Sequence, residues 1–97
     1  MDPLAVIENR IAEVRALGAR RIGVFGSFAR GDQRDESDVD VYVEFEEGKR
    51  TYDNLFALHE LLENVFGRPV DLVTDKSLSA TKARLILPTV RYASSHH

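Results

Sequence analysis

Short strand-like segments alternate with helical ones along most of this chain. The strand-like segments are either brief apolar runs or alternate apolar and polar side chains, whereas the helical ones repeat apolar residues at spacings of three and four. Three strands are expected, over residues 21–25, 38–45 and 70–74. Four helices are expected, over residues 3–17, 26–30, 52–66 and 77–87. The resulting order, α-β-α-β-α-β-α, predicts an α/β (α+β) fold with a mixed sheet packed against helices.

The ends of the predicted elements carry recognisable signals. Asp2 is suited to cap the first helix, and Pro3 lies in the first turn, where a missing N–H costs little. Gly18 and Gly67 follow helical segments and are expected to end them. Pro88 is expected to interrupt the last helix.

The length of 97 residues suits one domain with a single core. We assign residues 1–93 to that domain and interpret Ser94 to His97 as the start of an expression tag, with a natural polar tail as the alternative. The apolar fraction of 43% and charged fraction of 30% are ordinary for a soluble protein. The N-terminus has no signal-peptide pattern, and no stretch approaches the 18 apolar residues of a membrane span. A cytoplasmic protein is expected.

Charge and cysteine content exclude several classes of function. The net charge of −3 argues against a dedicated nucleic-acid binder, although acidic residues at a metal site can mask a basic patch. The absence of cysteine excludes a disulfide framework and a zinc site built on thiolates.

A glycine–serine pair follows the first predicted strand. Gly26 permits close approach to the backbone, and Ser27 would lie near the N-terminus of the short helix, where N–H groups favour anions. Arg30, about one turn later, could add a cationic contact to a phosphate. Residues 31–37 are polar and non-periodic, which predicts a loop.

Paired carboxylates begin the second predicted strand. Asp38 and Asp40 are two residues apart, so both project from one face of the strand and can reach a common divalent cation. On the third strand, the Asp71 side chain points opposite to those of its neighbours Val70 and Leu72. It is the natural third ligand if the second and third strands are adjacent. Mg²⁺ is satisfied by a few carboxylates together with water and substrate phosphates. Each of these features alone has an ordinary structural explanation, and their combination predicts Mg²⁺-dependent phosphoryl or nucleotidyl transfer.

Two other polar side chains have less specific interpretations. Tyr42 shares the strand face of the aspartates and either walls a nucleotide pocket or packs under a helix. His59 lies mid-helix and is expected at the surface or facing a partner rather than binding a metal.

These residues resemble the nucleotidyltransferase superfamily that includes DNA polymerase beta, and above all its minimal nucleotidyltransferase (MNT) branch. The resemblance rests on three stretches, namely 26–31, 37–41 and 66–73. It implies an α/β fold around a mixed sheet, phosphate binding by Gly26 and Ser27, and metal binding and catalysis by Asp38, Asp40 and Asp71. The segment after residue 77 departs from the family, because Pro88 shortens a helix that members often continue.

Members of the MNT branch are commonly encoded beside a HEPN-domain protein, a helical ribonuclease toxin, and serve as its antitoxin. The resemblance therefore implies transfer of AMP from ATP to a tyrosine of a HEPN toxin, with Mg²⁺ as cofactor and a hetero-oligomer with the toxin. The alternative is a non-catalytic antitoxin that occludes the toxin. Nucleotide transfer to a small molecule is a third possibility. Nucleotide preference, acceptor residue and stoichiometry stay open.

Overall fold

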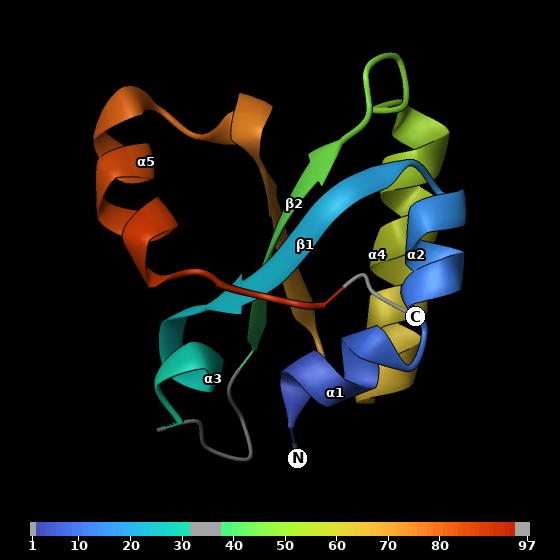
Figure 1. Cartoon of the computed structure of the whole chain (residues 1–97), viewed down its shortest axis with the longest axis horizontal. Helices are drawn as coiled ribbons and strands as arrows, with labels where there is room; N and C mark the ends of the chain where they lie inside the picture. The colour runs from blue at the N-terminus through green and yellow to red at the C-terminus, as the bar shows by residue number, and fades with distance from the viewer. Residues whose placement is uncertain (1, 32–37, 95–97) are drawn as a thin grey trace.

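The computed structural model describes residues 2–31 and 38–94 and shows one mixed sheet with helices on both faces (Figure 1). The sheet order is β3-β2-β1-β4. Strand β1 runs antiparallel to both β2 and β4, whereas β2 and β3 are parallel. The strands are β1 (Ala19–Phe25), β2 (Val39–Phe45), β3 (Val70–Thr74) and β4 (Arg91–Tyr92). The predicted fold class is confirmed.

Five α-helices and two 3-10 turns connect these strands in the described part of the chain. The helices are α1 (Pro3–Glu8), α2 (Ile11–Ala16), α3 (Gly26–Arg30), α4 (Tyr52–Phe66) and α5 (Ala80–Ile86). The 3-10 turns are η1 (Asp75–Ser77) and η2 (Leu87–Thr89). None of the described helices has the length and apolar character to cross a membrane.

The predicted helix over 3–17 is wrong in one respect, because it is two helices. Asp2 caps α1 as expected, with its carboxylate accepting from the Leu4 N–H at 3.1 Å. The chain then breaks at Asn9 and Arg10, where the Arg10 N–H bonds to the Ile7 carbonyl in a tighter turn at 2.9 Å. Asparagine is a poor helix former. The break still leaves the apolar residues on both sides of it buried in the core, at Ile7, Ile11 and Val14.

The core lies between one face of the sheet and helices α1, α2 and α4 (Figure 1). Val39, Val41 and Val43 of β2 are fully buried on this face, as their alternation predicts. Helix α4 has its predicted bounds, and Gly67 ends it with a φ of 68°. It contributes Leu58, Leu62 and Phe66 to the core, while the predicted members Leu55 and Val65 are only partly buried.

The opposite face of the sheet is covered less. On this face α3 lies at the end of β1, and α5 is set apart from the strands (Figure 1). None of the described residues of α5 is buried. The predicted helix over 77–87 is thus shorter, and Pro88 falls within η2 rather than after a helix.

Strand β4 was not expected from the sequence. It has only two residues, and it pairs with β1 through Gly23 with Tyr92 and Val24 with Arg91. Gly23 is required here, because a Cβ would lie 2.5 Å from the Arg91 carbonyl oxygen. Most of the predicted loop at 31–37 lies outside the described residues, as do most of residues 94–97.

Candidate active site

Strand register brings two of the predicted carboxylates side by side. Asp40 of β2 pairs directly with Asp71 of the parallel strand β3. Neighbouring strands lie about 4.8 Å apart, and paired residues point to the same face, here the less covered one. Asp38 lies immediately before β2 and is exposed, like Asp71. The condition that the sequence left open, adjacency of the second and third strands in this register, is met.

Asp40 has the most restricted environment of the three. Burial raises the pKa of its carboxyl group, and the negative charges of Asp71 and Asp38 raise this pKa further. The positive charge of Arg30 acts in the opposite direction. Asp40 therefore lies within electrostatic reach of both other aspartates and of the arginine at the end of α3.

The turn between β1 and α3 lies against the Asp40 carboxylate. Phe25, the last residue of β1, pairs with Asp40, and Gly26 follows with a φ of 70°. A Cβ on Gly26 would fall on the Asp40 carboxylate and lie 3.2 Å from its Cγ. Only glycine fits this backbone conformation and this space without strain. The predicted phosphate-binding turn and the predicted metal carboxylates are therefore in contact.

Helix α3 has the predicted bounds and is short. Phe25 is its N-cap residue and supplies no side-chain hydrogen bond to the first turn. Ser27 follows in that turn and is partly buried. Gly31 ends the helix with a φ of 79°, one residue after Arg30. The predicted phosphate-binding residues thus occupy one small turn of chain beside Asp40.

The donor set of this cluster suits a hard divalent cation. Three carboxylates supply oxygen ligands, which Mg²⁺ prefers, and their mutual repulsion favours a bound positive charge. The three aspartates are more widely spaced than a second set of candidate ligands. In the described part of the chain, candidate ligand atoms that all lie within 4.8 Å of one another belong to His59, Glu60 and Glu63 of α4.

The α4 set is largely committed to backbone contacts. His59 Nε2 lies 2.9 Å from the Val70 carbonyl oxygen, and the Val70 N–H donates to Glu63 Oε2 at 3.0 Å. His59 also lies 3.3 Å from Glu63. These two side chains therefore hold the start of β3 against α4. His59 was expected at the surface or facing a partner and instead contacts the β3 backbone, so that its not binding a metal stays a prediction. We take the aspartate cluster as the candidate metal site because the α4 ligand atoms are largely engaged in these contacts.

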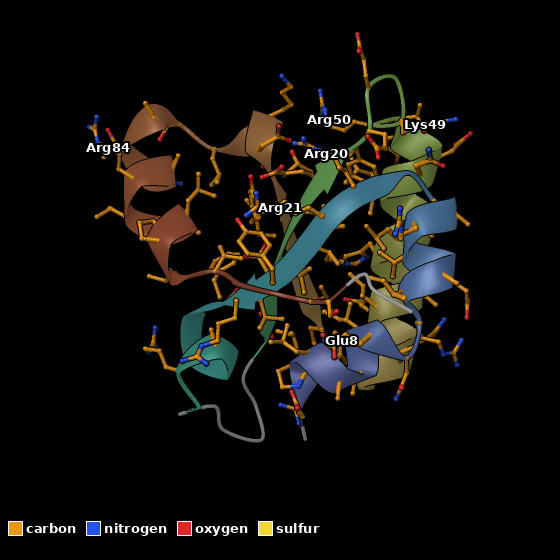
Figure 2. The ribbon with its side chains drawn as sticks, in the orientation of Figure 1. Glu8, Arg20, Arg21, Lys49, Arg50 and Arg84 are labelled. Atoms are coloured by element: carbon orange, nitrogen blue, oxygen red, sulfur yellow. The ribbon has the colours of Figure 1, made fainter. Side chains whose placement is uncertain are left out.

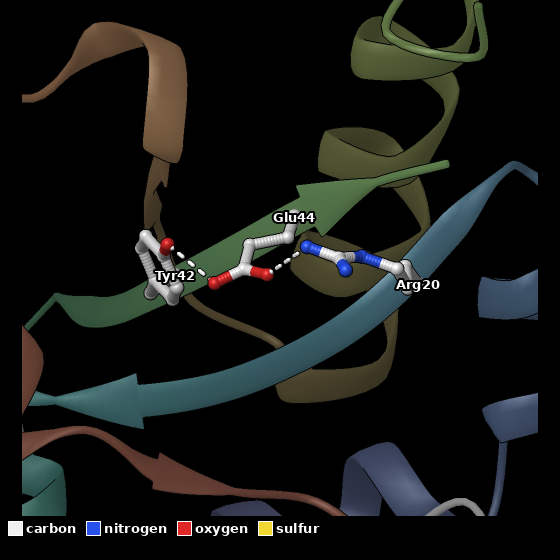
Figure 3. Close-up of polar contacts among 3 residues, drawn as sticks. All are labelled: Arg20, Tyr42 and Glu44. Atoms are coloured by element: carbon white, nitrogen blue, oxygen red, sulfur yellow. Dashed lines mark hydrogen bonds and ion pairs between the residues drawn. The ribbon is translucent and has the colours of Figure 1, made fainter. Parts of the chain in front are cut away.

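Tyr42 belongs to a cross-strand network. Its ring is buried and packs edge-on against Tyr92, with ring centroids 6.3 Å apart. Its hydroxyl donates to Glu44 Oε2 at 2.7 Å, and Arg20 of β1 reaches the other oxygen of Glu44 at 2.5 Å (Figure 3). Burial and then the Glu44 contact raise the pKa of Tyr42. Of the two predicted roles, these contacts match packing, although against the Tyr92 side chain of the same sheet rather than under a helix.

Sequence reasoning missed the arginine side of this network. The register of β1 shifts between Ala19 and Arg21, consistent with a bulge at Arg20. Arg21 lies over the Tyr92 ring, with its Cζ 3.7 Å from the centroid. Arg20 and Arg50 line one end of the sheet together, beside a hollow of 670 Å³ that is remote from the aspartates (Figure 2). Two consecutive arginines at the start of a strand were the available signal.

The comparisons with known proteins agree with this geometry. Residues 7–92 match the family described as a nucleotidyltransferase domain. The chain belongs to the nucleotidyltransferase domain family.

Relatives of this chain are named protein adenylyltransferases. MntA of Thermococcus cleftensis, a protein adenylyltransferase, is 44% identical over 75 residues, which are 77% of this chain and 75% of MntA. A protein of Methanocaldococcus jannaschii, provisionally named a protein adenylyltransferase, is 45% identical over 60 residues, or 61% of this chain and 60% of that protein. The chain thus spans less than two thirds of the second relative.

Solved structures share the fold. A protein provisionally described as a minimal nucleotidyltransferase has a TM-score of 0.76 and 37% identity, covering 94% of this chain and 95% of that one. A toxin–antitoxin structure with AMP-PNP has a TM-score of 0.66 and 23% identity, covering 91% of this chain and 74% of that one. At that lower identity the likeness shows the fold alone.

Proposed function

We propose that this chain is an antitoxin nucleotidyltransferase that transfers AMP from ATP to a tyrosine of a partner HEPN toxin in an Mg²⁺-dependent reaction. The observation that carries the proposal is the contact of the Gly26 turn with Asp40, which is itself paired with Asp71. It joins a candidate phosphate site to a candidate metal site. The names of the relatives as protein adenylyltransferases support the acceptor class.

The residues of the site have separate roles in the proposed reaction. The N–H groups of the Gly26–Ser27 turn and the Ser27 hydroxyl bind the phosphates of ATP, and Arg30 adds positive charge. Asp38, Asp40 and Asp71 hold Mg²⁺, which when bound neutralises charge on the reacting phosphate. The tyrosine oxygen forms a bond to the α-phosphorus, the bond from that phosphorus to the β-phosphate oxygen breaks, and pyrophosphate leaves. The phenolic proton passes to a carboxylate of the cluster.

A label-transfer experiment tests this function. Incubation with α-labelled ATP, Mg²⁺ and the HEPN-domain protein encoded beside this chain should label a tyrosine of that protein, detected by mass spectrometry. Asp40→Asn should lower the rate at least a hundredfold, because the site loses a metal ligand that no other described residue replaces. An absence of label with folded wild-type protein, or equal labelling by the Asp40→Asn variant, would contradict the proposal.

The second candidate function is toxin binding without catalysis. Helices α4 and α5 leave large apolar side chains in water, including Phe56 at 58% exposure and Leu85 at 70%, as a binding surface would. Asp38→Asn combined with Asp40→Asn separates the two functions. Neutralisation of the toxin that survives this double substitution supports occlusion, whereas loss of neutralisation from an intact complex supports catalysis.

The proposed partner determines the assembly and the cellular location that we propose for this chain. A complex with the HEPN toxin in the cytoplasm is a hetero-oligomer, and the chain itself needs no direct contact with nucleic acid. The net charge of −3 is consistent with that last point.

A further inference from the structure

The strand order suggests where the leaving group and the acceptor of the proposed adenylyl transfer lie relative to the sheet. The order β3-β2-β1 places the Gly26–Ser27 turn at the end of β1, Asp40 in the middle and Asp71 on the outer strand. In an in-line displacement the attacking and leaving oxygens lie on opposite sides of the phosphorus. With pyrophosphate held at the turn beside β1, an acceptor that approaches from the β3 side satisfies this geometry.

A groove lies on that side, between α4 and the edge strand β3. It has a volume of 390 Å³ and is lined mostly by apolar and aromatic side chains, namely Tyr52, Leu55, Phe56, His59, Val70, Asp71 and Leu72. Asp71 lines the edge of this groove, while its carboxylate points to the opposite face of the sheet together with Asp40. The groove therefore lies at the edge of the sheet that is nearest to the carboxylate cluster.

The α4 wall of the groove carries a stripe of aromatic rings outside the buried core. Tyr52, Phe56 and His59 follow one another at spacings of four and three, which places them on one face of the helix. Leu58 and Leu62 form the buried stripe on another face. Tyr52 is 83% exposed and Phe56 58% exposed. A helix packed on a sheet needs only one apolar stripe, and a second one next to a catalytic carboxylate indicates a contact surface.

The edge of β3 is closed to a long added strand. Alternate residues of a parallel edge strand turn their N–H and C=O groups outward. At Val70 these groups are taken by Glu63 and His59, and at Thr74 both are bonded to the Ser77 hydroxyl. Within residues 2–31 and 38–94, the outward-facing backbone groups of β3 that remain for a partner strand are those of Leu72, between Val70 and Thr74. The groove is therefore suited to side chains rather than to strand addition.

The charge of α4 restricts the partner further. The helix carries Asp53, Glu60 and Glu63 and no lysine or arginine. Asp53 and Glu60 lie three residues before and four residues after Phe56, so they flank its exposed ring. Asp71 of the neighbouring strand β3 adds a fourth carboxylate at the edge of the sheet. Such a surface repels nucleic acid and attracts a basic protein surface.

We propose that the α4–β3 groove docks a basic segment of the acceptor protein that inserts an apolar side chain beside Phe56, and that the acceptor hydroxyl group reaches Asp71 around the exposed edge of β3. This inference rests on the proposed function and identifies where the acceptor binds. The nucleotide side of the reaction lies at the other end of the cluster and does not use the groove.

Kinetics with the HEPN-domain protein encoded beside this chain test the groove. For Phe56→Ala and for Glu60→Lys we expect the KM for that protein to rise about tenfold or more, the scale of an interface hot spot. The KM for ATP should stay within about twofold. Both side chains are exposed, so thermal unfolding monitored by circular dichroism should change little.

Two matched variants serve as controls. Leu85→Ala removes a similarly exposed apolar side chain from α5, and Glu47→Lys reverses an exposed charge in the turn after β2. Neither should change the KM for the partner. If Leu85→Ala raises that KM while Phe56→Ala does not, the groove is the wrong surface and the partner docks on α5.

The design separates failure of the groove from failure of the reaction. If wild type labels the partner and Phe56→Ala has the same KM for the partner as wild type, the groove is not the docking site. The proposed adenylyl transfer is then still supported. If wild type labels nothing, the reaction fails, and the affinity of the same variants for the HEPN-domain protein, measured by titration calorimetry, still decides the docking site. Weaker binding by Phe56→Ala and Glu60→Lys, with unchanged binding by Leu85→Ala and Glu47→Lys, supports the groove, and binding by Phe56→Ala equal to that of wild type overturns it.

Discussion

Gly26 combines two constraints that can be separated experimentally. Its φ of 70° is unfavourable for other residues, and its missing side chain leaves room for the Asp40 carboxylate. Gly26→Ala should cost about 1–2 kcal/mol of folding stability from the backbone conformation alone. Displacement of Asp40 should in addition lower the rate of AMP transfer roughly a hundredfold, because small misplacements at a reacting centre are costly. Denaturant unfolding and label transfer measure the two effects.

Gly48→Ala is the control for that prediction. Gly48 has a comparable φ of 78°, but a Cβ there would meet nothing within 4 Å. It should lose a similar amount of stability and no activity. Equal activity of the Gly26→Ala and Gly48→Ala proteins would show that the contact with Asp40 does not matter for the reaction.

The shared strand face of the candidate carboxylates could be predicted from the sequence better than their contacts could. Asp40 and Asp71 each occupy a polar position between apolar residues, and this alternation is a local property. The contact of Gly26 with Asp40 could not be predicted, because it depends on β1–β2 pairing across the intervening loop. Tyr42 shows the same limit, since its hydrogen-bond partner is near in sequence and its ring partner Tyr92 is not.

At the scale of elements, the network of Tyr42, Glu44 and Arg20 ties β2 to β1. Tyr42→Phe should lower the free energy of unfolding by about 1 kcal/mol at pH 7, the value of one buried hydrogen bond. The folded state raises the pKa of Tyr42, so its contribution is present below the unfolded pKa of about 10 and is lost as pH rises above that value. The difference between wild type and variant should therefore shrink above about pH 10.

Urea unfolding at pH 7 and at several values between about 9 and 11 measures this effect. Tyr52→Phe is the control, because Tyr52 is 83% exposed and its substitution should leave the unfolding free energy nearly unchanged at every pH. A Tyr42→Phe difference that stays constant across the whole range would contradict the assignment of a protected neutral hydroxyl.

The elements themselves were predicted according to the strength of their local signals. Helix α4 has a long apolar stripe and a C-terminal glycine, and its bounds were predicted correctly. Strand β4 has two residues and is defined by its pairing with β1, so no periodicity could reveal it. The break between α1 and α2 was also missed, because the apolar spacing continues through Asn9 without interruption.

On the scale of the whole molecule, the carboxylate cluster opposes folding in the absence of a cation. Burial and two like charges disfavour the ionised form of Asp40. Asp40→Asn removes this charge, so the variant should unfold at a higher temperature than wild type when no Mg²⁺ or nucleotide is present. Glu47→Gln removes an equal charge from an exposed turn and should leave the midpoint close to that of wild type.

Addition of Mg²⁺ and ATP should reverse the order of stability. A ligand that binds only the folded state at about 100 times its dissociation constant contributes about 2.7 kcal/mol, and each kcal/mol corresponds to about 4–8 °C in a domain of this size. Wild type and Glu47→Gln should gain this increment and Asp40→Asn should not, in thermal unfolding followed by circular dichroism. Equal gains in all three proteins would place the nucleotide away from Asp40. A gain in stability confined to wild type and Glu47→Gln would show that the carboxylate that destabilises the free domain is also required to bind Mg²⁺ and ATP.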